Sequence, residues 1–172
     1  TETHPDPNDP DDIEDYWKNP QRVLKRNLNY INQCFYAGEA FPVICPYFAP
    51  AGHAEFFGGK PHYGLGTIWF EPTIFDLEKQ QPCFDPNNKS LKEQLDLYQY
   101  LVDHSEGRYL VSMPDHVGAA DALSHLMGSE TLLIEMIERP KLVKKAIDAI
   151  NDGLEIISKS FYRVVKDEDG GS

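Results

Sequence analysis

The stretch 107–148, GRYLVSMPDHVGAADALSHLMGSETLLIEMIERPKLVKKAID, carries the strongest structural signal in the chain. Its apolar run RYLVSM predicts a strand that is covered on both faces. Pro114 stops further ladder pairing, and Asp115 is well placed to cap the helix that follows. An acid and a histidine, Asp115 and His116, therefore come directly after the strand. Because sites in parallel α/β folds are built at the carboxyl ends of strands, this junction is the first candidate site.

The remainder of this stretch predicts helices separated by a glycine and a proline. The residues GAADALSHLMG predict a helix with one apolar face that ends at Gly128, a residue suited to a helix C-terminus. Ser129 is the expected N-cap of the next helix, which stops before Pro140. Pro140 then begins a last long helix, whose apolar residues recur at helical spacing as far as Val164.

The N-terminal part predicts the same alternation of strands and helices. The expected elements are a short helix and a longer one within 12–36, with Asn19 as the second N-cap; a buried strand of about five residues within 41–50; one or two helical turns at 51–59; an extended segment at 67–70; and a helix that Asn88 or Ser90 caps and that reaches about His104. Strands that alternate with helices indicate a parallel α/β arrangement. Three strands are visible, whereas a closed (β/α)8 barrel needs eight.

Charge and composition exclude several classes of protein. The chain has 16 basic and 28 acidic residues, a net charge of −12, and no basic cluster, so we expect no nucleic-acid partner. No apolar run approaches the roughly 20 residues of a membrane span, and no signal-peptide pattern is visible, so we expect no membrane partner and a cytoplasmic protein. The three cysteines are expected to be reduced thiols.

The polar ends of the chain suggest a piece of something longer. Residues 1–11 are rich in proline and aspartate and are expected to be extended or disordered, and 12–172 are expected to form one partial α/β domain. A processed or tagged protein that is complete at this length is the alternative.

The residues YLVSMPDHVGAADALSHLMGSETLLIEMIERPKLV, together with FFGGKPHYGLGTIWFEP, resemble the uroporphyrinogen decarboxylase superfamily, in particular an uncharacterised bacterial branch. The resemblance implies an internal, helix-rich segment of a TIM (β/α)8 barrel. It also implies that the parent is an enzyme, either a cofactor-free decarboxylase of a tetrapyrrole or a corrinoid-dependent methyltransferase in which zinc holds a thiol acceptor. The segment alone is expected to be inactive.

Two family motifs are absent from this segment. The arginine-rich R-x-A-G-R motif of the decarboxylase is missing, and the nearby Arg22 and Arg26 fall on an expected helix. The H-x-C pair of the zinc-dependent methyltransferases is missing too. The missing arginine motif gives some weight to methyl transfer. A third possibility is a non-catalytic module that forms a homodimer, because strands cut from a barrel leave unpaired edges and an exposed apolar face.

Three residues are candidate catalytic groups. At the top of a barrel, Asp115 can orient or protonate an intermediate and His116 can relay a proton. Tyr47 ends the first expected strand, and its phenol can donate to a substrate carboxylate. The structural alternatives are that Asp115 only caps a helix, that His116 is a solvated loop residue, and that Tyr47 is a half-buried aromatic.

Candidate substrate-binding residues lie between the first two expected strands and on the second. They are His53, His62 and Trp69. His53 and His62, with Glu55, fall in a glycine-rich region and could ligate a metal, but their scattered spacing favours surface roles, and no metal site is predicted. Trp69 lines a pocket or belongs to the core. Asp121 and His125 lie one helical turn apart and are expected to make a helix-surface contact.

Overall fold

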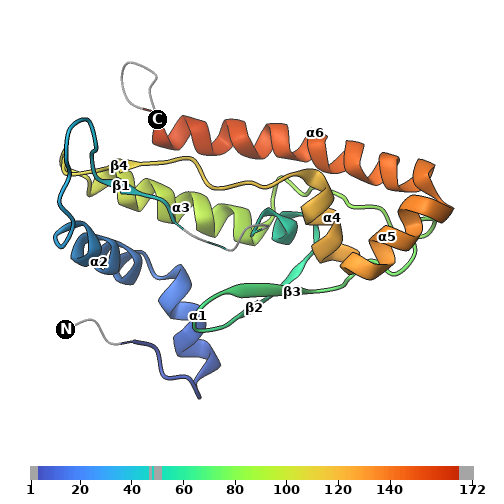
Figure 1. The fold of residues 1–172 in the computed structure, drawn as a ribbon, viewed down its shortest axis with the longest axis horizontal. Coiled ribbons are helices and arrows are strands. Elements are labelled where there is room, and N and C mark those ends of the chain that lie inside the picture. The colour runs from blue at the N-terminus through green and yellow to red at the C-terminus, as the bar shows by residue number, and fades with distance from the viewer. Residues whose placement is uncertain (1–3, 47, 49–51, 167–172) are drawn as a thin grey trace.

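The computed structural model describes residues 4–46, 48 and 52–166 and shows a helix-rich chain with short strands (Figure 1). Its helices are α1 (Pro10–Lys18), α2 (Pro20–Ile31), the 3₁₀ helix η1 (Gly52–Phe57), α3 (Lys89–Asp103), α4 (Ala119–Met127), α5 (Ser129–Glu138) and α6 (Pro140–Val165). Its strands are β1 (Val43–Ile44), β2 (Lys60–Tyr63), β3 (Ile68–Glu71) and β4 (Leu110–Val111). Helix α1 thus begins within the N-terminal stretch for which no regular structure was expected.

The strands form two separate pairs. β1 and β4 are parallel, with Val43 opposite Leu110 and Ile44 opposite Val111. They lie side by side next to α3, which contacts β4 (Figure 1). β2 and β3 form an antiparallel hairpin. The parallel pair agrees with the α/β arrangement expected from the sequence, whereas β2 was not predicted and makes the hairpin a new feature.

The parallel strands are shorter and more open than the sequence indicated. Ile44 and Val111 are buried, but Val43 and Leu110 are 42% and 47% exposed. The prediction that the strand after Gly107 is covered on both faces is therefore wrong. Each strand has one covered side and one open side in the described part of the chain, and the four described strands close no barrel.

Proline and asparagine residues set the helix starts, largely as predicted. The side chain of Asn19 accepts from the first backbone amides of α2, and the Asn88 side chain accepts from Leu91 N in α3. Two other predicted caps are wrong. Helix α4 begins at Ala119 after Gly118, so Asp115 is too far away to cap it, and Ser129 is the first residue of α5 and follows Gly128.

Helix α6 is the longest element and runs alongside α3, with α4 and α5 at one end (Figure 1). Its expected apolar stripe is confirmed, because Val143, Ile150, Ile157 and Phe161 are all buried. Gly153 lies in the same stripe, where the Phe57 ring of η1 fits against the helix backbone. The core thus joins α6 directly to η1.

In residues 4–46, 48 and 52–166, no helix combines the length and the apolar character that crossing a membrane requires. The three cysteines are free thiols, as predicted.

Candidate functional site

Two histidines meet where the parallel strands end. η1 follows β1 in the chain and carries His53, and His116 lies shortly after β4. The ring centroids of His53 and His116 are 5.2 Å apart, with the ring planes inclined at 64°. Two segments that are far apart in the sequence therefore bring imidazoles together at the carboxyl ends of neighbouring parallel strands, where α/β folds place their sites.

Both imidazoles are held in the neutral form. His53 is only 1% exposed, and neither of its ring nitrogens has a hydrogen-bond partner among the described residues. Burial, together with the smaller effects of the neighbouring His116 and His125, lowers the pKa of His53 to about 4. Burial also lowers the pKa of His116 to about 4, against a weaker opposing effect of Asp115. At neutral pH each ring thus has one N–H donor and one free lone pair.

Aromatic side chains and a third histidine enclose the pair. Phe161 of α6 contacts the edge of the His116 ring at 5.8 Å between centroids. His125 of α4 packs against Phe70 at 5.4 Å, and its pKa is lowered by burial. Sequence reasoning had assigned His125 to a surface contact with Asp121. Only the packing of α4 against η1 brings it near His53, and no spacing rule in the sequence encodes that contact.

The other two candidate catalytic residues are placed differently. Asp115 is exposed and serves as no helix cap; its charge raises the pKa of His116. Tyr47 lies outside the described residues. The expectation that His116 is a solvated loop residue is wrong, because its ring is packed between His53 and Phe161. The expected surface role of His53 is also wrong, because its ring is buried against His116.

His62 and Trp69 lie opposite each other on the β2–β3 hairpin. Their rings stack with centroids 5.9 Å apart and planes within 15° of parallel. His62 Nε2 is 2.9 Å from Glu71 Oε1, and Trp69 is 52% exposed. Trp69 is therefore not a core residue. Among the described side chains, no hydrogen bond, ion pair or ring contact links this stacked pair to His53 or His116.

A metal ion does not fit the described side chains. Among residues 4–46, 48 and 52–166, no three His, Cys, Asp or Glu residues are grouped so that they could hold one. His53 and His116 supply two imidazoles, whereas a catalytic zinc ion takes three protein ligands.

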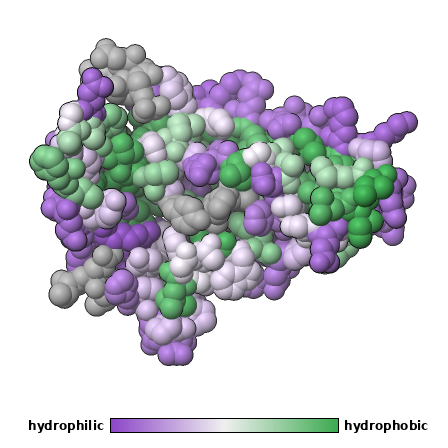
Figure 2. Space-filling model, in the orientation of Figure 1, coloured by the Kyte–Doolittle hydropathy of each residue, from purple (hydrophilic) through white to green (hydrophobic). Residues whose placement is uncertain are grey.

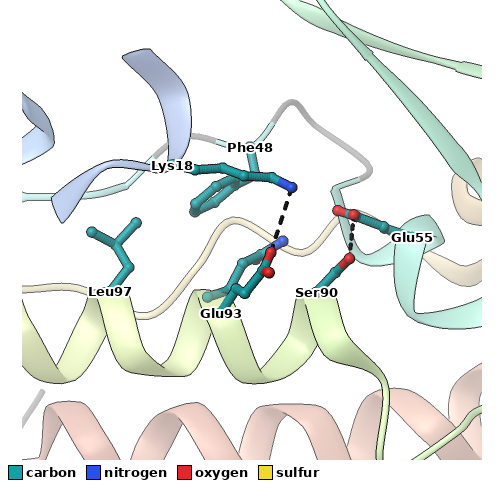
Figure 3. Close-up of a pocket in the computed structure, with 7 residues that line it drawn as sticks. Lys18, Phe48, Glu55, Ser90, Glu93 and Leu97 are labelled. Carbon is teal, nitrogen blue, oxygen red and sulfur yellow. Dashed lines mark hydrogen bonds and ion pairs between the residues drawn. The ribbon is translucent and has the colours of Figure 1, made fainter. Parts of the chain in front are cut away.

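A polar cluster that sequence reasoning missed lies on the other side of η1. Lys18, Glu55, Ser90 and Glu93 line a small hollow together with the buried Gln94 and with apolar walls from Phe48 and Leu97 (Figure 3). The polar residues come from α1, η1 and α3. Ser90 was considered only as a helix cap, and no motif marks Lys18, so only the tertiary structure identifies this cluster.

Comparison of the chain with protein-family models, with curated proteins and with solved structures finds no match. The resemblance to the uroporphyrinogen decarboxylase superfamily therefore rests on the sequence residues quoted above.

Proposed function

We propose that this chain is part of a cytoplasmic, uroporphyrinogen decarboxylase-like α/β barrel enzyme and that His53 and His116 belong to its active site. The observation that carries the proposal is the meeting of two neutral imidazoles, the buried His53 and the half-buried His116, in the segments that follow β1 and β4. Buried histidines with a strongly shifted pKa are more common at functional sites than elsewhere.

The chemistry of decarboxylation suits such a pair. Loss of CO2 from a carboxylate leaves an electron pair on carbon, and a proton must be delivered to that carbon to complete the product. A neutral imidazole is a poor acid at pH 7 when its pKa is about 4. A substrate carboxylate bound beside it would favour the charged form and raise the pKa toward neutrality. Binding of an anionic substrate would then prepare His116 to donate, with no cofactor.

The test is an assay of the natural protein that contains this chain, with His116→Asn and His53→Asn as variants. Loss of carboxylates from a tetrapyrrole is followed by mass spectrometry, and a general acid or base is expected to contribute about 10²- to 10⁴-fold to the rate. His104→Asn is the matched control, because His104 is exposed at the end of α3. Full activity in both site variants would place the chemistry elsewhere.

Methyl transfer is the second candidate function. The charged side chain that acts on the pair within the described part of the chain is Asp115, an acid beside His116, and the chain has a net charge of −12. These charges repel a tetrapyrrole with many carboxylates and so favour a less anionic substrate, such as a corrinoid. Because the described residues do not form a zinc site, a zinc-held thiol would need ligands from elsewhere. The same protein should be assayed for methyl transfer from a corrinoid to a thiol, and inactivity in both assays would reject the superfamily assignment.

A non-catalytic, self-associating module is the third candidate. The open sides of β1 and β4 support it, because Val43 and Leu110 expose apolar side chains beside unpaired strand edges. This candidate is tested by the oligomeric state of the chain.

A further inference from the structure

We infer that Glu55 is a positioning residue: by fastening η1 to the start of α3, it sets the rotation of η1 and so holds the His53 ring against His116. This goes beyond the proposed function, since it concerns how the chain builds the pair. The inference depends on the proposed function only for its effect on catalysis.

Glu55 is attached to α3 at two points. Ser90 Oγ donates to Glu55 Oε1, and Asn88 Nδ2 donates to the backbone carbonyl of Glu55 at 3.3 Å. Asn88 also caps α3, because its Oδ1 accepts from Leu91 N at 3.1 Å. The Asn88 amide thus joins the start of α3 to η1, and a turn of η1 would break the two hydrogen bonds that Asn88 and Ser90 make to Glu55.

Charge holds the Glu55 carboxyl group in the same place. Burial raises its pKa, while the Ser90 hydroxyl and the charge of Lys18 oppose that rise. Lys18 is itself fixed by Glu14 Oε1 at 2.7 Å and Glu93 Oε2 at 3.5 Å. The carboxylate also lies at the first turn of α3, where the helix dipole favours negative charge. Figure 3 shows Glu55 and Lys18 both pointing into the hollow, with Ser90 beneath Glu55.

The geometry of a 3₁₀ helix transmits this restraint to His53. With about three residues per turn, residues two apart point in directions roughly 120° from each other. Glu55 can therefore face α1 and α3 while His53 faces His116, and a rotation that frees one side chain moves the other. Phe57, two residues further along η1 than Glu55, is packed against Gly153 of α6. Among the described contacts, η1 is thus held on separate sides, by polar contacts at Glu55 and by apolar packing at Phe57.

The test compares Glu55→Ala, Glu55→Gln and Ser90→Ala in the full chain by NMR. The readouts are the pKa of the His53 ring, followed through its Hε1 resonance, and the nuclear Overhauser contacts between the His53 and His116 rings. We expect Glu55→Ala to lose those contacts and to raise the pKa of His53 from about 4 toward 6.5, by about one unit or more, as the ring gains solvent. Glu55→Gln keeps an acceptor for Ser90 but loses the charge that attracts Lys18, so it should shift the His53 pKa less than Glu55→Ala does.

Controls separate positioning from a general loss of stability. Glu155→Ala removes an exposed carboxylate whose partner is Lys159 on α6, and it should leave both histidines unchanged. If Glu55→Ala does not fold, Ser90→Ala removes one hydroxyl and should give a smaller shift in the same direction. Ring contacts and a His53 pKa that stay as in the wild type in a folded Glu55→Ala or Ser90→Ala protein would overturn the inference. These readouts need no substrate, so their failure would leave the proposed function standing, and inactivity in both assays would leave this inference standing.

Discussion

His53 is placed where it weakens the fold. A buried polar atom without a partner costs about 1–3 kcal/mol, and both nitrogens of this ring lack one among the described side chains. An apolar residue would fill the same space without that cost. Residues that are unfavourable for stability commonly persist at sites that need them for function.

We therefore expect His53→Leu to stabilise the protein by about 1–2 kcal/mol while removing any activity of the site. The measurement is the free energy of unfolding in urea at pH 7. His4→Leu, at an exposed position, is the control and should change stability by less than about 0.5 kcal/mol. If His53→Leu were clearly less stable than the wild type, the imidazole would have to make a hydrogen bond that the leucine cannot replace. That result would contradict the interpretation of His53 as an unpaired group.

The two histidines should also make stability depend on pH. Their folded-state pKa of about 4 lies below the ordinary 6.5, so between these values the unfolded chain binds protons that the folded chain does not. Stability is therefore fully present above pH 6.5 and falls as the pH drops toward 4, by up to about 3 kcal/mol for each histidine. Urea unfolding at pH 7, 5.5 and 4.5 should show a shallower fall in His53→Leu/His116→Leu than in the wild type. An equal slope in both proteins would assign the acid sensitivity to carboxylates instead.

Among the elements, the helices could be predicted and the strand environment could not. The sequence signals for the helices are local: the caps Asn19 and Asn88 and the apolar stripe of α6 each depend on residues close together in the chain. The exposure of Leu110 depends on which elements pack over its strand, and no local sequence pattern predicts that packing. His53 was assigned to the surface for the same reason: the contact with His116 joins residues that are far apart in the chain. The sequence thus pointed to the position after β4 as a candidate site, and that remains a prediction, whereas the burial of the neighbouring His53 in η1 could not be read from it.

The contact between α6 and η1 gives a prediction for Gly153→Ala. In an exposed helix this change stabilises by about 1 kcal/mol, but here an added Cβ would lie 2.6 Å from the Phe57 ring and 3.0 Å from Phe84 Cβ. Overpacking costs about 1–3 kcal/mol, so we expect a net loss of about 1 kcal/mol. Thermal unfolding measures it, with Asn151→Ala on the exposed side of α6 as a control that should be neutral or stabilising. A more stable Gly153→Ala protein would mean that Phe57 moves away freely and that η1 is not held there.

Among the exposed apolar residues that the structure describes, two groups are of interest. One lies at the open β1–β4 pair, and the other covers α5, where Leu133, Ile134, Met136 and Ile137 are 42–84% exposed. Figure 2 shows the second as a continuous hydrophobic area at the end of the molecule that α5 forms. The two areas differ in kind, because the strands also offer unpaired backbone groups to a neighbour, whereas the backbone of a helix is already hydrogen-bonded.

If self-association uses the strand edges, it should depend on Val43 and not on Ile137. We expect the wild-type chain to sediment as a dimer or larger species and Val43→Lys to sediment as a monomer with an unchanged far-ultraviolet circular dichroism spectrum, because a lysine on an edge strand opposes pairing with another chain. Ile137→Lys is the matched control: it places the same charge on an apolar side chain that is 84% exposed and should leave the assembly intact. Dissociation by Ile137→Lys alone would move the interface to α5. A monomeric wild-type chain with a well-dispersed NMR spectrum would show that β1 and β4 need no partner, and that result would argue against both the self-associating module and the incomplete barrel.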